Sequence, residues 1–294
     1  MLLWQTISAH ISTATGKPFT VESQRSVGGG CINDACVVGN GDVSYFVKTN
    51  TAVCAFMFEA EAAGLAEIAG THAICVPQPV CFGIAGNAAY LVLECLEFGQ
   101  GKSETQRSLG AQLAAMHQIR HKQYGWCRDN TIGSTPQSNA EMGNWVDFWR
   151  ESRLGFQLSL AVRNGAPAAI ERKGESLKAS LASFFPGIMP PPSLLHGDLW
   201  SGNWAADSEG NPVIFDPAVY YGDRETDIAM TELFGGFSPD FYAAYREAYP
   251  LDAGYKVRKT LYNLYHILNH YNLFGGGYAS QAERMIDSLL SEIR

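Results

Sequence analysis

Three oxygen-bearing side chains lie in one short apolar stretch of this 294-residue chain, LLHGDLWSGNWAADSEGNPVIFDP, residues 194–217. Asp198 ends the run SLLHGD, Asn203 lies five residues further on, and Asp216 ends the run PVIFD thirteen residues after that. Ionised groups in apolar surroundings are costly unless they meet a cation or a reacting proton. Since Mg²⁺ prefers carboxylate and amide oxygens, the stretch predicts a divalent-cation site with an acid–base group beside it.

The local structure expected here brings the three residues together. NWAAD and PVIFD are typical of two short strands joined by the turn SEGN, and such a hairpin places Asn203 close to Asp216. Asp198, on the preceding loop, can face the same point without binding the metal. This is the arrangement for a base that accepts a hydroxyl proton while metal-bound phosphate is attacked. The spacing is that of the protein-kinase catalytic loop and its metal-binding aspartate; the alternative is that the three residues only cap a loop, a turn and a strand.

A glycine triplet upstream could hold phosphates. Gly28, Gly29 and Gly30 lie in SVGGGCINDA between two strand-like runs, where glycine lets backbone N–H groups approach phosphate closely. No Gly-Lys-Ser/Thr follows and no helix is expected to start there, which excludes a Walker loop and a Rossmann turn. A simple hairpin turn would have the same composition.

Lys48 lies in the next strand-like run, SYFVKTN, on the same face as Phe46. A lysine inside an apolar strand needs a partner, and the following helix FMFEAEAAGL offers Glu61, with Glu59 in reserve because only one of the two can point inward. Such a pair holds the lysine against the α- and β-phosphates of a nucleotide. An exposed lysine at a sheet edge, with a solvated glutamate, is the alternative.

The remaining pattern predicts an α+β protein of two lobes, with a small antiparallel sheet and one helix in the first lobe and a larger, mainly helical second lobe. Residues 1–97 contain the β-rich runs and bind the nucleotide; residues 98–294, after the glycines of EFGQGK, carry the catalytic stretch and the substrate site. LVLECLEF should be the hinge between them, where backbone groups near Glu94 and Leu96 could hydrogen-bond an adenine edge.

Composition excludes several classes of function. The formal charge of −8 argues against binding to nucleic acid or anionic lipid, and 46% hydrophobic residues are typical of a packed globular protein. No apolar run approaches the roughly 18–20 residues of a membrane helix, and the first residues lack a signal-peptide pattern. Seven irregularly spaced cysteines give no zinc framework and favour a cytoplasmic location.

At this point the motifs resemble a known family. HGDLWSGN, IFDPAVYYGDRETDIAM, ELFGGF and NHYNLFGGGY are similar to motifs of the fructosamine-3-kinase and ketosamine-3-kinase family, and the resemblance runs nearly end to end. The broader aminoglycoside phosphotransferase and choline kinase superfamily shares the HGD…N…D core, but Trp200 and the loop GGGCIN favour the ketosamine branch. The resemblance implies a two-lobed protein-kinase-like fold, ATP and Mg²⁺ as cofactors, and phosphorylation of a ketoamine at the third hydroxyl of its sugar, after which the amine is released.

Carried over to this sequence, the resemblance makes Asp198 the base and Asn203 and Asp216 the magnesium ligands, while Lys48 with Glu61 positions the phosphates. These roles agree with those that the residue types and their spacing predict. Phosphoryl transfer of this kind needs positioning and charge neutralisation more than covalent chemistry by the protein.

The acceptor pocket is defined less sharply. Trp200 could offer a flat face to the sugar or to its protonated amine, or could pack beneath the catalytic loop. His270 and Asn269 could reach the acceptor cleft from the C-terminal helices, although a histidine that is part of the core is the alternative. Three further residues are expected to support the structure, namely His196, Asp227 and His117.

Two other functions compete with this interpretation. A small-molecule kinase of the aminoglycoside or choline type would share the magnesium core and differ in the acceptor pocket. A nucleotide-binding pseudokinase would typically lack the lysine, the base or the metal aspartate, and this sequence has all three. Sequence does not distinguish fructose, ribulose and erythrulose adducts, nor free from protein-bound ketoamines.

Cys31 follows the three glycines directly, in a loop that should attract anions and therefore favour a thiolate. We expect that oxidation of Cys31, or a disulfide between two chains, obstructs ATP binding. Activity should then fall under oxidant, return under reductant, and be insensitive to both in Cys31→Ser. Equal activity of the natural chain under the two conditions would rule this switch out.

Overall fold

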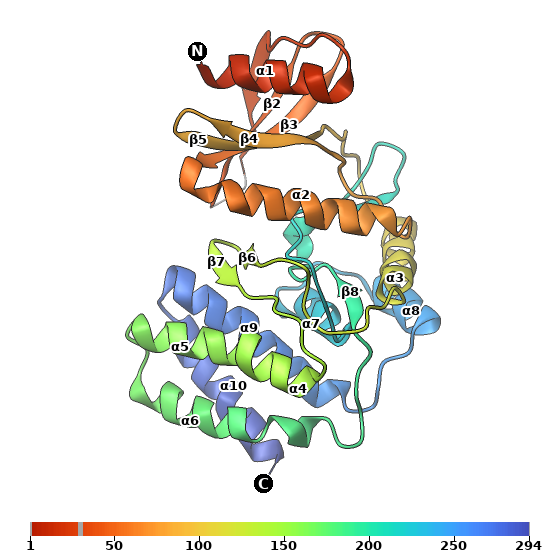
Figure 1. Ribbon diagram of the computed structural model, residues 1–294. Coiled ribbons are helices and arrows are strands. Elements are labelled where there is room, and N and C mark those ends of the chain that lie inside the picture. Colours follow the sequence, from red (N-terminus) through yellow and green to blue (C-terminus); the bar gives the residue numbers. More distant parts are fainter. Residues whose placement is uncertain (1, 29–31, 294) are drawn as a thin grey trace.

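The computed structural model describes residues 2–28 and 32–293 and has the α+β architecture expected from the sequence. Figure 1 shows a small part built on a sheet above a larger, mainly helical part. The sheet is antiparallel, with strand order β1-β2-β3-β5-β4. Its strands are β1 (Ser23–Ser26), β2 (Asp34–Gly39), β3 (Ser44–Thr51), β4 (Pro79–Ala85) and β5 (Ala88–Glu94).

One helix covers each face of this sheet (Figure 1), α1 (Leu2–Thr15) on one side and α2 (Ala55–Gly70), after a 3₁₀ turn (Ala52–Cys54), on the other. The alternation of strand side chains explains both contacts. Val47 packs in the cluster under Ile7 and Ile11 of α1, whereas Leu91 and Leu93 pack in the cluster that includes α2. The sequence predicted one helix in this part, so α1 is a correction, and β4 was also missed.

A short connection leads from β5 to α3 (Ser103–His117), which packs tightly on α8 (Pro239–Ala248). Gly110 makes this close approach possible, because a Cβ at that position would lie 2.2 Å from the Phe241 carbonyl oxygen. Both helices belong to the mainly helical part that the sequence predicts.

The larger part contains three two-stranded ladders and the remaining helices. The ladders pair β6 (Asn130–Ile132) with β7 (Thr135–Gln137), β8 (Ser193–Leu195) with β11 (Tyr220–Gly222), and β9 (Trp204–Ala206) with β10 (Pro212–Ile214). The helices are α4 (Trp145–Phe148), a π-helical turn (Trp149–Gly155), α5 (Phe156–Arg163), α6 (Ala168–Ala179), 3₁₀ turns at Leu181–Phe184 and Ser201–Asn203, α7 (Glu225–Leu233), α9 (Tyr255–Phe274) and α10 (Tyr278–Glu292).

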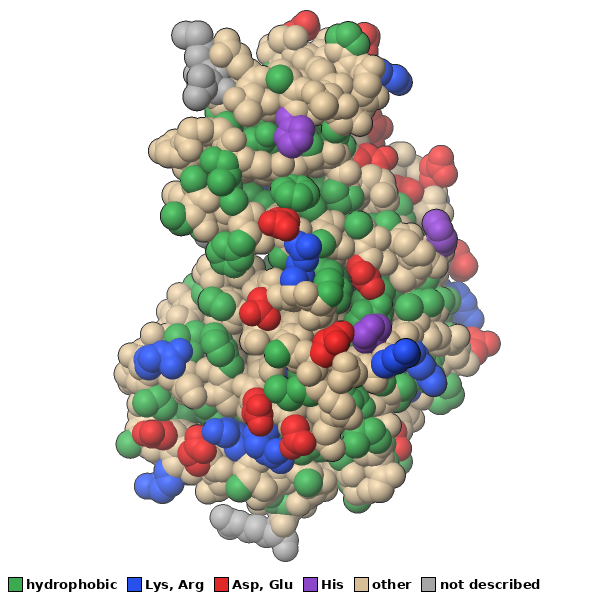
Figure 2. All heavy atoms as spheres, in the orientation of Figure 1, with side chains coloured by type: hydrophobic (Ala, Val, Ile, Leu, Met, Phe, Trp, Pro, Cys, Tyr) green, Lys and Arg blue, Asp and Glu red, His purple; other side chains and the backbone are tan. Residues whose placement is uncertain are grey.

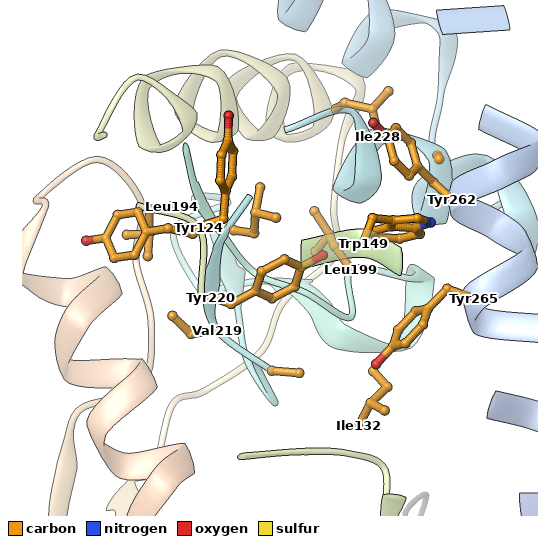
Figure 3. Close-up of a cluster of buried hydrophobic side chains, with 14 of the residues drawn as sticks. Tyr124, Ile132, Trp149, Leu194, Leu199, Val219, Tyr220, Ile228, Tyr262 and Tyr265 are labelled. Atoms are coloured by element: carbon orange, nitrogen blue, oxygen red, sulfur yellow. The ribbon is translucent and has the colours of Figure 1, made fainter. Parts of the chain in front are cut away.

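The core of the larger part is rich in aromatic side chains (Figure 3). Trp149 contacts Tyr262 and Tyr265 of α9 at ring-centroid distances of 4.9 and 5.8 Å. Leu199, from the loop that follows β8, is fully buried in the same core. The two C-terminal helices are separated by glycines, with Gly275 at φ +66° directly after α9.

Figure 2 shows acidic and basic side chains interspersed over the visible face. Among the helices of the described residues, none combines the length and apolar character needed to cross a membrane.

Buried histidines should make the fold sensitive to acid. Burial, helped by neighbouring His270, lowers the pKa of His266 on α9 to about 3, although Asp227 acts in the opposite direction. An unfolded histidine has a pKa near 6.5, so below that pH the unfolded chain binds the extra proton and the folded state loses stability. The folded-state pKa of His117 and of His196 is lowered too, again mainly by burial, so both act in the same direction.

We therefore expect the free energy of unfolding to fall as pH decreases from about 6.5 towards 4. His266→Phe should reduce that slope by up to about 1.4 kcal/mol per pH unit, the value for one proton. Denaturant titrations at several pH values measure the slope, with exposed His121→Phe as the control. The same slope in His266→Phe and the natural chain would contradict the prediction.

Candidate active site

The loop after β8 is fixed by a glycine. Gly197 has φ +82°, and a Cβ there would lie 2.1 Å from the Ala218 carbonyl oxygen, so a side chain at this position would meet backbone. The Ala218 N–H donates to the His196 carbonyl oxygen at 2.8 Å. The loop that carries Asp198 is thus laid directly against the segment that follows Asp216.

Asp227, in the first turn of α7, holds the same loop from beneath. Its carboxylate accepts the backbone N–H groups of His196 and Gly197 at 2.7 and 2.9 Å. The His117 ring lies 3.1 Å from the carboxylate. Burial alone would raise the pKa of Asp227, but the hydrogen bond and charge of His117 hold it below its usual value. The expectation that Asp227 and His117 are structural is confirmed.

His196 supports the loop by hydrogen bonds, as expected. Its Nε2 lies 2.9 Å from the Phe215 carbonyl oxygen, and its Nδ1 lies 3.3 Å from the Asp198 backbone nitrogen. Burial lowers the pKa of this imidazole. A neutral ring bonded on both sides ties the residue before Asp216 to the loop of Asp198.

The β9–β10 hairpin brings Asn203 and Asp216 to the same end, as the sequence predicted. Ile214 pairs with Trp204, and the Phe215 N–H donates to the Asn203 carbonyl oxygen at 3.0 Å. The Asn203 side-chain nitrogen donates to the Asp198 carbonyl oxygen at 2.8 Å and lies 3.4 Å from its carboxylate. One buried amide therefore connects the two aspartate-bearing segments.

Burial and neighbouring acids both act on the carboxyl of Asp198. Burial first, and then the negative charges of Asp216 and Asp227, raise the pKa of the Asp198 carboxyl to about 7. Asp216 has φ +58°, which is uncommon for a residue with a side chain, and its side chain is 47% exposed. The pair therefore concentrates negative charge beside an accessible carboxylate, where a cation would be favoured.

Lys48 supplies one such cation. Its Nζ lies 2.6 Å from Glu61 Oε1 and 2.5 Å from Asp216 Oδ1, and the lysine is 6% exposed. Burial alone would lower the pKa of Lys48, but the two carboxylates raise it above its ordinary value. Glu59 is exposed and pairs instead with Arg128 at 3.0 Å. The structure thus settles the alternative that the sequence left open, in favour of Glu61.

Helix α2 is docked on the segment after Asp216, a contact that the sequence did not reveal. A Cβ at Gly64 would lie 3.0 Å from Val219 Cγ2, and the Tyr221 hydroxyl donates to Glu67 Oε1 at 2.6 Å. Gly64 and Glu67 lie three and six residues after Glu61 on α2. The helix that orients Lys48 is therefore held against the chain that carries the second aspartate.

The predicted nucleotide contacts are only partly described. Gly28 is exposed, whereas Gly29, Gly30 and Cys31 lie outside the described residues. Glu94 ends β5 and its N–H donates to the Gln78 carbonyl oxygen at 2.8 Å; Leu96, in the connection beyond it, is half-buried.

The connection after Leu96 is attached to the β9–β10 hairpin. The Gly99 N–H donates to the Ala206 carbonyl oxygen at 3.0 Å. Phe98 stacks on Phe215 with ring centroids 5.6 Å apart, and Phe215 directly precedes Asp216. The link between the sheet and the helical part therefore lies beside the aspartate segment.

Trp200 is on the surface of the catalytic loop rather than beneath it. Its side chain is 40% exposed, and a Cβ at Gly202 would lie 2.3 Å from its ring. Because residue 202 is a glycine, the indole of Trp200 can lie over its own loop. The ring is therefore accessible to solvent on the loop that carries Asp198.

His270 and Asn269 have different surroundings. His270 Nδ1 lies 2.7 Å from the His266 carbonyl oxygen, and its ring contacts Phe234 and Tyr278 at centroid distances of 5.1 and 5.2 Å. Asn269 is buried, and its amide bonds Gln157 and the Ile132 carbonyl oxygen. Asn269 is thus a structural residue, which corrects the expectation that it reaches the acceptor cleft.

Similarity to solved structures shows the fold class. A crystal structure of a fructosamine-3-kinase candidate from Haemophilus somnus 129PT superposes with a TM-score of 0.89 at 31% identity, over 98% of this chain and 97% of that one. The aminoglycoside phosphotransferase APH(4)-Ia, in a ternary complex with AMP-PNP and hygromycin B, gives 0.62 at 14% identity, over 97% and 98%. The expectation of a two-lobed, protein-kinase-like α+β fold is confirmed.

Sequence relatives show the family. A probable ketoamine kinase of Synechocystis sp. is 50% identical over 292 residues, 98% of this chain and 97% of that protein. The chloroplastic protein-ribulosamine 3-kinase of Arabidopsis thaliana is 45% identical over 282 residues, 95% and 86% of the two chains. The family model described as fructosamine kinase matches residues 3–292. The chain therefore belongs to the fructosamine kinase family.

Proposed function

We propose that this protein is a ketosamine 3-kinase, which transfers the γ-phosphoryl group of ATP to the third hydroxyl of a sugar joined to an amine as a ketoamine. The 3-phosphate product is unstable and releases the amine, so the reaction removes a sugar adduct. The observation that carries the proposal is the buried Lys48 between Glu61 and Asp216, with Asp198 beside them. Membership of the fructosamine kinase family supports the ketoamine as substrate.

Asp198 is the proposed base. Its carboxyl, with a pKa raised to about 7, can exchange a proton near neutral pH, and the Asn203 amide restricts its position. The acceptor hydroxyl would give its proton to this carboxylate as its oxygen attacks the γ-phosphorus. Lys48 would move from its contact with Asp216 to the nucleotide phosphates while it keeps its bond to Glu61.

The residues present fit a magnesium ion. The Asn203 amide nitrogen is engaged with Asp198, so the amide oxygen is the atom left for a cation, and the Asp216 carboxylate already meets a cation in Lys48. Asn203 and Asp216 would hold the ion, which neutralises charge on the phosphates. Two protein ligands suit Mg²⁺, since it usually keeps water and phosphate oxygens in its other positions.

The acceptor is proposed to lie against Trp200, and His270 is proposed to contact it as well. The exposed indole offers a flat π-face next to Asp198, and such a face attracts both sugar C–H groups and a protonated amine. His270, which touches Phe234 and Tyr278, would contribute to an aromatic wall. An aminoglycoside or choline kinase is the alternative, and the ketoamine kinase relatives do not favour it.

The other predictions from the sequence are retained as proposals. The nucleotide would contact backbone groups near Glu94 and Leu96, and its phosphates the segment Gly28, Gly29, Gly30 and Cys31. The lobes would divide between residues 97 and 98. A cytoplasmic location and a redox-linked dimer through Cys31 belong to the same set.

ATP consumption against a panel of acceptors tests the function. We expect turnover with fructose, ribulose or erythrulose adducts of an amine, and none with choline or an aminoglycoside. Asp198→Ala should lower turnover at least about a hundredfold, because the proton acceptor is lost, while nucleotide binding is retained. Turnover of choline or an aminoglycoside without any ketoamine would refute the proposal.

Glu61→Gln tests the lysine pair, with Glu59→Gln as the matched control on the same helix. Loss of a hydrogen bond between charged groups is worth about 1.5–3 kcal/mol, so kcat/KM for ATP should fall about ten- to a hundredfold in Glu61→Gln. Glu59→Gln should stay within a few-fold of the natural chain, since exposed ion pairs contribute about 0–1 kcal/mol. Equal losses in the two variants would show that Glu61 has no special role.

A further inference from the structure

The β6–β7 hairpin (Asn130–Gln137) has no part in the function proposed above, yet it lies between the sheet part and the helical part (Figure 1). Strand β6 contacts α2, the helix of Glu61, and β7 contacts α9, the helix of His270. This short hairpin therefore contacts elements on both sides of the candidate site. A turn that was simply exposed on the surface would need neither contact.

Buried amides attach the base of the hairpin to the aspartate segment. Asn130 Nδ2 donates to the Val219 carbonyl oxygen at 2.8 Å, and Gln137 Nε2 donates to the Ala218 carbonyl oxygen at 3.2 Å. Ala218 and Val219 follow Asp216 by two and three residues. Buried amides are costly unless bonded, so these contacts fix the hairpin relative to Asp216.

Helix α9 fixes the hairpin from the other side. The Tyr265 hydroxyl donates to Gln137 Oε1 at 2.6 Å, and Asn269 Nδ2 donates to the Ile132 carbonyl oxygen at 3.3 Å. Figure 3 shows the Tyr265 hydroxyl directed towards Ile132. The strands are therefore held at both ends, which leaves the turn at residues 133–134 in a defined position.

At that turn, two apolar side chains converge on Gly133. The residue has φ +63°, and a Cβ there would lie 3.0 Å from Leu273 Cδ1 and 3.1 Å from Ile32 Cδ1. Leu273 lies three residues after His270 on α9. Ile32 follows the glycine-rich segment, and its carbonyl oxygen accepts from Asn50 Nδ2 at 3.0 Å. We call Ile32, Gly133 and Leu273 the clasp.

The clasp joins the three parts that phosphoryl transfer requires. Ile32 comes from the nucleotide side, where Asn50 lies two residues after Lys48 on β3. Leu273 lies on α9 three residues after His270, which the proposed function assigns to the acceptor side, and Gly133 belongs to the hairpin bonded to the segment after Asp216. Ile32 and Leu273 are both half-buried.

We propose that the clasp closes the edge of the transfer site against water, so that the γ-phosphoryl group passes to the sugar hydroxyl and not to water. This inference rests on the proposed kinase function. In transfer, the acceptor oxygen bonds to the γ-phosphorus, the bond from that phosphorus to the β–γ bridging oxygen breaks with its electron pair on ADP, and Asp198 takes the hydroxyl proton. Attack by water gives ADP, inorganic phosphate and a proton instead.

The clasp residues act as positioning residues, because they touch neither the reacting hydroxyl nor the bond that breaks. Exclusion of water is one way in which a closed site prevents hydrolysis. Truncation of Leu273 or Ile32 to alanine removes apolar volume at the edge and leaves room for water. The consequence is a change in how ATP is partitioned, which a general loss of stability would not produce.

The test measures ADP formed per ketoamine consumed, and ADP formation without an acceptor, in Ile32→Ala, Leu273→Ala and the double variant. The natural chain should give a ratio near one. Each single variant should raise the ratio and the acceptor-free hydrolysis several-fold. The double variant should add little to the larger single effect, since the two side chains close one gap.

Leu290→Ala, which truncates a half-buried leucine on α10 away from the clasp, is the matched control and should keep the natural ratio. Leu273→Ile and Ile32→Leu, which keep the apolar volume, should restore it. Thermal unfolding reports whether each variant is folded, and Leu273→Val replaces Leu273→Ala if the latter is not.

An unchanged ratio of ADP to ketoamine in the folded clasp variants, or an equal rise in Leu290→Ala, would overturn the proposal that the clasp excludes water. Failure of the natural chain to phosphorylate any ketoamine would instead refute the proposed function. The two failures are distinguishable because acceptor-free hydrolysis reports water access with no ketoamine present.

Discussion

A buried lysine is the constraint on which the site depends. The Lys48 ammonium is removed from water, so it must meet carboxylates, and it finds one from α2 and one from the segment after β10. The sheet, the helix and the aspartate segment are therefore fixed relative to one another by one charge. Glu61 and Asp216 are two acidic groups against one ammonium group, and Asp198 adds a third acid nearby. That excess of negative charge is what favours a further cation.

Residues that take no direct part in the proposed reaction also hold the site in place. Asp227 accepts two backbone N–H groups of the Asp198 loop, and the Asn203 amide joins that loop to the hairpin of Asp216. Hydrogen bonds to the backbone leave the loop little freedom, which is the precision that phosphoryl transfer requires. The amides of β6 and β7 extend the support to the opposite face of the segment after Asp216.

Helix α2 is also held by the chain that follows Asp216. Its glycine at position 64 lies against Val219, and Tyr221 bonds Glu67, so the helix is held along its length by the chain that follows Asp216. Ile32 of the clasp, which follows the glycine-rich segment, is held by its contacts with Gly133 and Asn50.

Sequence by itself determined the features that depend on local order: the spacing of Asp198, Asn203 and Asp216, the strand alternation that turns Lys48 inward, and the glycine break between α9 and α10. Only the tertiary structure decided between Glu59 and Glu61, because that choice depends on which side of α2 meets the sheet. It also revealed α1, the burial of Asn269 and the convergence on Gly133. Those features arise where segments distant in the sequence pack together, and neither periodicity nor motif spacing encodes which faces meet.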